Sequence, residues 1–236
     1  MSQLGLTLLD MIAVVWFVAC WVGYMVFSEW HAHRTASLLS RMDFYRREWM
    51  RRTVQRENRI VDAAIVQNLF QGNNFLASTS ILVLGGLAAL LGASTRAIDV
   101  MASLPLAQAS SERGFEFKIL LMIVIFVYAF FKFTWAMRQF NFLSLMIGTA
   151  PAKSDEPAAI ESFINRAATL ASLAGENSNR GLRAFYFAMA AMSWFMHAVL
   201  FMAVSALVVG ILYHREFRSR TLLALMEGAD GGKQAA

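Results

Sequence analysis

The hydrophobic positions of this sequence fall into four long runs, each long enough to cross a lipid bilayer as a helix. A bilayer core of about 30 Å needs about 20 mostly apolar residues in helical conformation. Because backbone N–H and C=O groups find no solvent partner in hydrocarbon, helices are the conformation that satisfies them at this length. We therefore predict four transmembrane helices. They cover residues 6–27, 75–91, 117–137 and 183–213.

The polar stretches between these runs predict two helical connections, over residues 28–72 and 138–182. In the first, apolar side chains recur at helical spacing over residues 40–70 and predict one amphipathic helix. Its apolar stripe holds Met50, Val54, Val61, Ile65 and Leu69, and Arg52, Arg56 and Arg59 lie on another face. In the second connection, Ser154 to Pro157 is typical of a helix start and Gly175 of a helix end.

The arginines predict which side of the membrane each connection occupies. Cytoplasmic loops carry an excess of Lys and Arg, and the first connection contains eight arginines. We therefore expect both long connections in the cytoplasm and the N-terminus outside, in a bacterial-type inner (plasma) membrane. With four spans the C-terminus is also expected outside, although its tail carries Arg215, Arg218, Arg220 and Lys233. The predicted fold is all-α: one membrane domain over residues 1–236, with amphipathic cytoplasmic helices.

The composition excludes an ordinary soluble domain and changes how the basic charge is interpreted. Hydrophobic residues make up 58% of the chain and charged residues only 16%, against about 25% charged in soluble domains. The net charge of +5 suits the anionic inner leaflet, which attracts basic residues next to a span. Membrane lipids are thus the expected partner, and nucleic acid is not.

Small residues predict where the spans pack closely. The second span carries Gly85 and Ala89 four residues apart, a spacing that lets helix backbones approach each other in lipid. The third span is bulky on all sides, with aromatic residues from Phe126 to Trp135. We expect it to face lipid or to wedge between the subunits of a homo-oligomer.

Several longer motifs carry a family resemblance. They are REWMRR (47–52), RIVD (59–62), NNFLASTSILVLGGLAALLG (73–92), FFKFTWAMRQFNF (130–142), GTAP (148–151), NRGLRAFYFAMAAMSWF (179–195) and LYHREFRS (212–219). Together these segments resemble the family catalogued as Domain of Unknown Function 599. The resemblance implies a four-span membrane protein without an established activity. It supplies no catalytic or binding residues.

The basic residues near the third and fourth spans are the first candidates for chemistry. Lys132 lies in an aromatic run and Arg138 follows it. A charge at the bilayer centre costs at least about 2.5–3.5 kcal/mol, so such residues often face a pathway. The alternative is that both side chains extend to the headgroups. Residues 140–150 either continue this helix or form a re-entrant element.

The intramembrane polar residues are the second group of candidates. Asp10 is expected near the outer interface, where it would cap the helix, pair with a cation or relay protons. His197 is expected in the middle of the fourth span. The sequence contains no phosphate-binding loop and no metal-binding or nucleophile motif of the common enzymes. We therefore predict no enzyme, no cofactor and no metal site.

Two functions fit these observations. The first is an oligomeric channel- or transporter-like module for a small solute or anion, with Lys132, Arg138 and Arg183 forming a basic vestibule. The second is an accessory or scaffold protein that docks an unidentified membrane or cytoplasmic protein, or anionic lipid. Arg52, Arg56 and Arg59 would form that docking face. A polar path through an oligomer favours the first function, and a dry, tightly packed interior favours the second.

Overall fold

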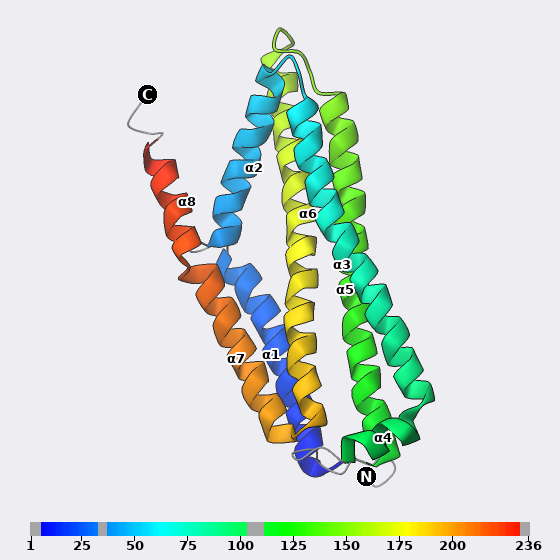
Figure 1. Ribbon diagram of the computed structural model, residues 1–236. Helices are drawn as coiled ribbons and strands as arrows, with labels where there is room; N and C mark the ends of the chain where they lie inside the picture. The colour runs from blue at the N-terminus through cyan, green and yellow to red at the C-terminus, as the bar shows by residue number, and fades with distance from the viewer. Residues whose placement is uncertain (1–5, 33–36, 103–110, 232–236) are drawn as a thin grey trace. The chain divides into compact units, whose positions relative to one another are not determined.

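The computed structural model describes residues 6–32, 37–102 and 111–231, and every regular element in these ranges is helical. The first four helices are α1 (Leu8–Ala32), α2 (Leu38–Gln55), α3 (Ile60–Gly92) and α4 (Ser94–Ala102). They are followed by α5 (Glu112–Gly148), α6 (Pro157–Met192), the 3₁₀ turn η1 (Ser193–Phe195), α7 (Ala198–Phe217) and α8 (Arg220–Gly231) (Figure 1). Arg34 and Lys233, counted above among the basic residues, lie outside the described residues.

Four segments are long and apolar enough to cross a membrane, which indicates a multi-pass membrane protein. They are Leu8–Ser28, Ile60–Gly92, Glu112–Gly148 and Ala198–Met226. Three of the helices exceed the membrane-spanning length: α3 has 33 residues, α5 has 37 and α6 has 36. At about 1.5 Å per residue each is about 50 Å long or more, so part of each must extend beyond a 30 Å hydrocarbon core.

The chain divides into two compact units, and α3, α5 and α6 each contribute to both. Unit 1 consists of Met1–Glu29, Ser78–Phe130 and Gly181–Tyr213. Unit 2 consists of Trp30–Ala77, Phe131–Arg180 and His214–Ala236. The apolar spans therefore meet in unit 1, whereas unit 2 collects the parts of the chain that are richer in arginine.

The interior of unit 1 is built from aromatic rings. The Phe17 ring on α1 lies 5.7 Å from that of Phe187 on α6 and 5.0 Å from that of Phe201 on α7, measured between ring centroids. Trp194 stacks on Phe201 at 5.1 Å. Phe17, Phe187 and Phe201 are fully buried. Aromatic pairs at these separations add attraction beyond the burial of their surface, and they fix α1 beside the α6–α7 pair.

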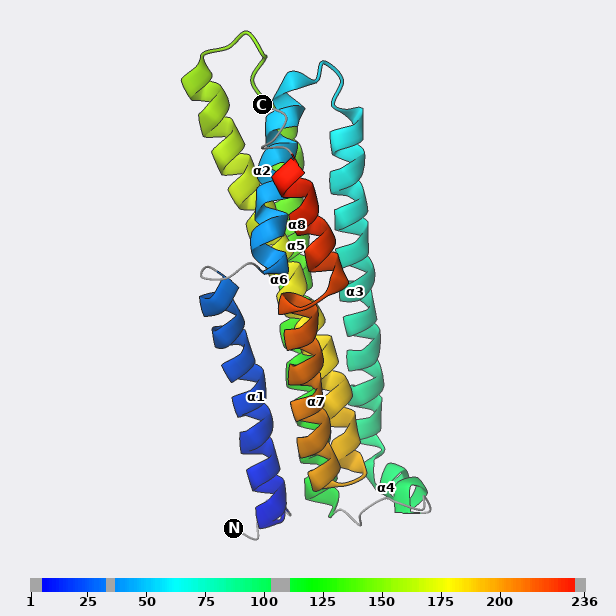
Figure 2. The ribbon, with the colours of Figure 1, turned by 90° about the vertical axis from the view of Figure 1, so that its left-hand side faces the viewer.

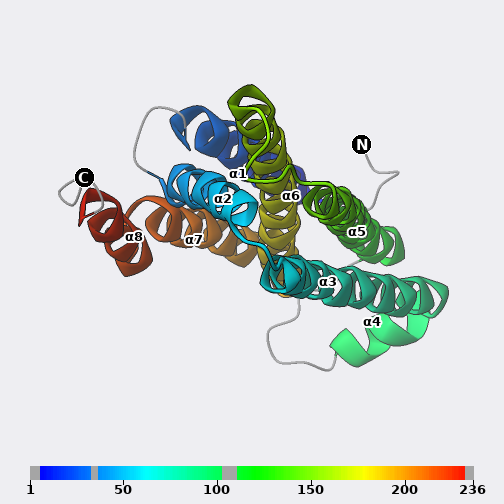
Figure 3. The same ribbon diagram turned by 90° about the horizontal axis from the view of Figure 1, so that it is seen from above.

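Unit 2 has an aliphatic core between α2, α5 and α6. Its fully buried members include Met50 on α2, Leu143 on α5 and Ala167 on α6. Seen from above, α6 lies between α2 and α5 (Figure 3), and its alanines allow both neighbours to approach. The short helix α8 lies along α2 (Figure 2), where the Tyr45 hydroxyl donates to the Leu225 carbonyl at 3.2 Å.

The prediction of one helix over residues 40–70 is wrong. α2 ends at Gln55 and α3 begins at Ile60. The side chain of Asn58 accepts a hydrogen bond from the Ile60 backbone N–H at 2.9 Å and so caps the new helix. The change of direction splits the predicted stripe, since Met50 and Val54 are buried whereas Val61 and Ile65 are exposed.

The predicted fourth span, residues 183–213, is also wrong as a single helix. Residues up to Met192 belong to α6, and α7 starts only at Ala198. His197, expected in mid-span, lies in the turn between them. Its Nδ1 atom accepts a hydrogen bond from the Val199 N–H at 3.1 Å, one of the free donors at the start of α7.

Two open points of the second connection are settled by helix continuity. α5 runs without interruption to Gly148, so residues 140–148 continue the third predicted helix rather than forming a re-entrant element. α6 begins at Pro157 but does not end at Gly175. That glycine instead admits α2, because a Cβ atom there would overlap the guanidinium group of Arg46.

Candidate functional site

A group of charged and aromatic residues surrounds the start of α1 in unit 1. Thr7 and Asp10 cap the helix reciprocally: the Asp10 N–H donates to the Thr7 hydroxyl, and Thr7 donates to the Asp10 carboxylate from its backbone N–H and its hydroxyl. This arrangement satisfies free donors of the first turn. The indole of Trp194 donates to the other Asp10 oxygen at 2.8 Å. Asp10 therefore joins α1 to the turn between α6 and α7.

Lys118, which the sequence analysis missed, completes this group. It is only 5% exposed, and its Nζ atom lies 5.5 Å from the centroid of the Trp194 ring and 5.9 Å from that of Phe195. It also lies within electrostatic reach of Asp10. A cation over aromatic faces next to a carboxylate offsets part of the cost of its burial. The signal in the sequence was a single lysine at the edge of an apolar run.

The contacts of Trp194 also fix the direction of the last two helices within unit 1. Its ring lies 6.1 Å from Phe117 near the start of α5, and its indole reaches Asp10 near the start of α1. The α6–α7 turn thus lies at the end of unit 1 where α1 and α5 begin. The last part of α6 runs toward this end and α7 runs away from it, so the two parts of the predicted span 183–213 are antiparallel segments.

Arg183 is buried in unit 1 between α1 and α6. It is 4% exposed, its Nη1 atom donates to the Ser28 hydroxyl at 2.7 Å, and its guanidinium lies 5.3 Å from the centroid of the Tyr24 ring. Hydrogen bonding and stacking are the two ways in which a guanidinium group is accommodated away from water. These contacts connect α6 to the end of α1.

Lys132 and Arg138 belong to unit 2 and have different surroundings. Lys132 donates to the Asn177 side-chain oxygen at 3.4 Å, and the amide of Asn177 donates to Gln139 at 3.0 Å. Arg138 is exposed and lies 5.8 Å from the ring centroid of Phe142. Within unit 2 these two cations therefore face different neighbours. A pathway role for Lys132, Arg138 and Arg183 stays a prediction.

The three arginines expected to bind lipid or a partner make contacts within unit 2. Arg52 pairs with Glu48 at 2.8 Å and Arg56 with Asp62 at 2.6 Å. Arg59 donates to the backbone carbonyls of Ala150 and Pro151, which satisfies acceptors after the end of α5. Arg52 remains largely exposed, whereas Arg56 and Arg59 hold the α2–α3 corner and the α5–α6 connection.

Asp62 is the centre of that corner. The carboxylate is fully buried in the first turn of α3, and one of its oxygens accepts from Trp49, Thr53 and Arg56 at 2.7, 3.0 and 2.6 Å. A carboxylate at a helix N-terminus also interacts favourably with the helix dipole. The donors come from α2 and from the residue that follows it, so this one side chain fixes the angle between α2 and α3.

The most distinctive surface is a stripe along the exposed side of α3, which we call the α3 stripe. It consists of Gln67, Gln71, Asn74, Ser78, Leu82, Gly85, Ala89 and Gly92, all exposed. At 3.6 residues per turn, the Cα positions of these residues lie within about 40° of that of Ser78 in rotation about the helix axis. The buried residues Asn73, Ser80 and Leu87 lie on the opposite side of the helix. No other atom approaches a Cβ position at Gly85 or Gly92 among the described residues.

Comparison with known proteins places the chain in one family. A family model described as "protein of unknown function, DUF599" matches residues 12–221. The chain belongs to DUF599. No curated protein and no solved structure matches it. The resemblance proposed from the motifs is thereby confirmed, and the family description assigns no activity to this DUF599 member.

The geometry shows what several of the DUF599 motif residues do in this chain. In RIVD (59–62), Arg59 holds the α5–α6 connection and Asp62 the α2–α3 corner. In NRGLRAF, Arg183 joins α6 to α1. These polar residues have structural contacts, whereas the NNFLASTS and GGLAALLG motifs contribute the α3 stripe, which has no intrachain packing role at its glycines.

We expect Asp62→Ala to destabilise this DUF599 protein, because three donors that converge on the carboxylate lose their acceptor. Hydrogen bonds to a charged group are worth about 1.5–3 kcal/mol, so the free energy of unfolding should fall by about 2–3 kcal/mol. Denaturant unfolding in mild detergent measures it. The matched control is Asp43→Ala, which removes a more exposed pair with Arg46 and should cost less than about 1 kcal/mol. Equal losses in the two variants would contradict the role given to Asp62.

Proposed function

We propose that this protein is a subunit of a homo-oligomeric membrane assembly of the channel or transporter type, which passes a small solute or anion. The observation that carries the proposal is the α3 stripe. It combines amides, a hydroxyl and small residues on the exposed side of a helix that is apolar enough to span a bilayer. A face of this kind gains little from contact with lipid, because packing between helices and hydrogen bonds to polar groups are both lost there.

The length of the α3 stripe fits a path across the membrane. From Gln67 to Gly92 it extends for about 38 Å along the helix, which exceeds a hydrocarbon core of about 30 Å. One copy does not enclose such a path, because the interior of unit 1 is filled by aromatic side chains. Copies arranged with their α3 stripes around a common axis would cover the glycines and place the amides at the entrance.

Preference for anions is assigned to the basic residues predicted from the sequence. Lys132 and Arg183 make contacts with Asn177 and Ser28. Arg138 is exposed, so we assign the attraction of a dissolved anion to this residue. Rings of basic side chains select anions in pores. The proposal includes no catalytic step.

The scaffold function is less well supported by the contacts. Arg47 pairs with Glu161, Arg52 with Glu48 and Arg56 with Asp62, so a partner docking on this face would have to displace carboxylates. The scaffold function predicts a dry, tightly packed interior, and the aromatic interior of unit 1 agrees with this. That interior belongs to a single copy, however, and does not describe an assembly of copies. It does not account for the polar and small residues on the exposed side of α3.

We also propose that the last part of α6 crosses the membrane in addition to the four candidate spans, which changes the topology. With the N-terminus outside, α1, α3 and α5 are followed by α6 passing outward and α7 passing inward, and the C-terminus is then cytoplasmic. The earlier expectation of an external C-terminus rested on treating residues 183–213 as one helix. The revised arrangement places Arg215, Arg218 and Arg220 on the same side as the arginines of α2, in agreement with the positive-inside rule.

A reporter fused to the C-terminus should therefore read as cytoplasmic, and a reporter fused at the N-terminus as external. Alkaline phosphatase and fluorescent-protein fusions measure the two sides. An external C-terminal reporter would contradict the outward passage of α6.

Cross-linking tests the assembly through the α3 stripe. In a Cys20→Ala background, which removes the one native cysteine, Ser78→Cys should form a disulfide-linked dimer under mild oxidation in membranes. The matched control is Val124→Cys on α5, which is 60% exposed but lies off the stripe and should remain uncross-linked. Equal cross-linking at the two positions would remove the argument for an α3 interface.

Flux measurements test the pathway itself. Liposomes containing the wild-type protein should release a small anion, and Arg138→Met should lower this flux by about tenfold, the scale on which a local charge concentrates counter-ions. Arg166→Met removes an exposed arginine of α6 and should leave the flux unchanged. If cross-linking succeeds but the wild type shows no flux, the oligomer stands and the transport function fails.

A further inference from the structure

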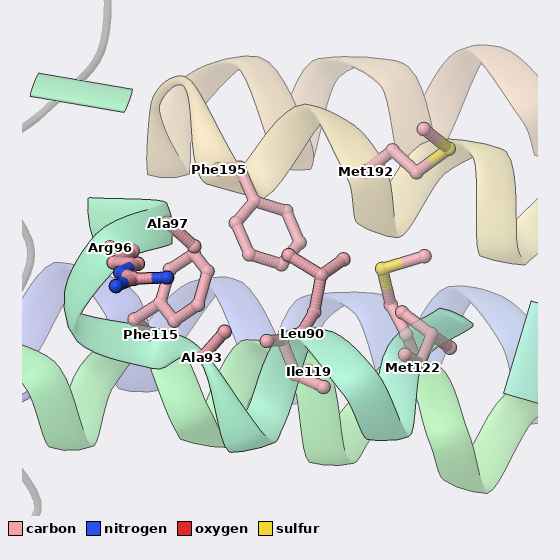
Figure 4. Close-up of a pocket in the computed structure, with 10 residues that line it drawn as sticks. Leu90, Ala93, Arg96, Ala97, Phe115, Ile119, Met122, Met192 and Phe195 are labelled. Carbon is pink, nitrogen blue, oxygen red and sulfur yellow. The ribbon is translucent and has the colours of Figure 1, made fainter. Parts of the chain in front are cut away.

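Unit 1 contains an apolar pocket that the proposed pathway does not use. Its volume is about 530 Å³, and it lies between the end of α3, α4, the start of α5 and the end of α6 (Figure 4). This is the end of unit 1 at which the α6–α7 turn lies. Pockets that hold small molecules usually measure about 300–1,000 Å³, so the pocket is large enough for a ligand.

The lining consists of nine apolar residues and one arginine. The apolar residues are Leu87, Leu90, Ala93, Ala97, Phe115, Ile119, Met122, Met192 and Phe195, and the arginine is Arg96. Arg96 lies at one end of the pocket, Met122 and Met192 lie at the other, and the ring of Phe195 lies between them (Figure 4). The pocket is thus apolar along its length and positively charged at one end.

We propose that this pocket binds an acyl chain of an anionic phospholipid from the surrounding bilayer, with Arg96 contacting the phosphate of its headgroup. The pattern of one charge and a long apolar lining matches an amphiphile rather than a wholly polar or wholly apolar ligand. The two methionines suit a flexible chain, because unbranched side chains adapt their shape to what they contact. The guanidinium of Arg96 binds phosphate oxygens in pairs.

The position of Arg96 supports a headgroup contact. It lies in the first turn of α4 (Ser94–Ala102), and it is exposed although it lines the pocket. The neighbouring hydroxyls of Ser94 and Thr95 already donate to Glu112 at 3.2 Å. Arg96 is therefore the group that would bind the phosphate, while the acyl chain of the lipid would lie against Phe115, Ile119 and Phe195.

Lipid retention measures this binding directly. Delipidated full-length protein is incubated with equal amounts of dioleoyl phosphatidylglycerol and dioleoyl phosphatidylcholine in mild detergent, and the bound lipids are counted by native mass spectrometry. The two lipids share their chains and differ in net headgroup charge. The wild type should retain one phospholipid per chain and should prefer phosphatidylglycerol.

Two substitutions separate the chain contact from the headgroup contact. Ala93→Phe fills the pocket and should lower retention by at least about tenfold, the effect of displacing two methylene groups from an apolar site. Its control is Val124→Phe, at an exposed position of α5 away from the pocket. Arg96→Gln should keep the chain bound but lower the preference for phosphatidylglycerol about fivefold, the contribution of one basic residue. Its control is Arg113→Gln, another exposed arginine near this end of unit 1.

Three outcomes would overturn the proposal. They are a wild type that retains no phospholipid, an Ala93→Phe variant that retains as much as Val124→Phe, and an Arg96→Gln variant with the same headgroup preference as Arg113→Gln. None of these outcomes bears on the α3 stripe, because Leu87 and Leu90 line the pocket from other sides of that helix.

Discussion

Within a bilayer no solvent competes for backbone hydrogen bonds, and this constraint underlies the long unbroken helices of the chain. A straight helix can bury only one side against its own chain. For α3 the buried side carries Asn73, Ser80 and Leu87, and the opposite side carries the stripe from Gln67 to Gly92. Hydrocarbon would favour leucine and valine on that exposed side. The presence of Ser78, Gly85 and Ala89 on that side within unit 1 is the physical reason for expecting a second copy to cover it.

Most of the charges in unit 2 act within the chain. Asp62 gathers donors from α2 and the α2–α3 corner, and Arg59 reaches the carbonyls after α5. In unit 1, Arg183 and Lys118 are buried beside aromatic rings. Since buried polar groups cost free energy unless they are paired, these residues limit the ways in which the helices can pack. Several of the charges that suggested partner binding thus make contacts within the chain, some between helices and some within one helix, and partner binding itself stays a prediction.

The sequence predicted the spans at 6–27, 75–91 and 117–137 because length and hydrophobicity decide them, and it predicted the DUF599 membership from its motifs. It failed at Arg56–Arg59 and at residues 193–197, where no Gly or Pro marks the break. Both turns depend on tertiary contacts: Asp62 with its donors, and Trp194 with Asp10. One signal was available, since a span of residues 183–213 would be about 46 Å long, well beyond a bilayer core.

The same distinction applies to the candidate sites. The positions of Lys132, Arg138 and Arg183 were visible in the sequence, but their partners Asn177, Phe142 and Ser28 are distant in the chain or depend on helix phase. The surroundings of Lys118 depend on the packing of α1 and η1 against α5, and the Arg96 pocket depends on the packing of α3, α4, α5 and α6. The α3 stripe could have been found by counting turns, but its exposure could not, because exposure depends on which side the other helices cover.

The central claim is that copies of this chain assemble through the exposed side of α3. The most direct measurement is the mass of the particle extracted from membranes into lipid nanodiscs, determined by mass photometry. For the wild type we expect a protein mass of at least two 26.4 kDa chains, in a whole-number multiple. For the Gly85→Leu variant, which fills the α3 stripe, we expect the mass of a single chain. A wild-type particle that contains a single 26.4 kDa chain, prepared with the protein as dense in the lipid as it is in the membrane, would contradict assembly through α3.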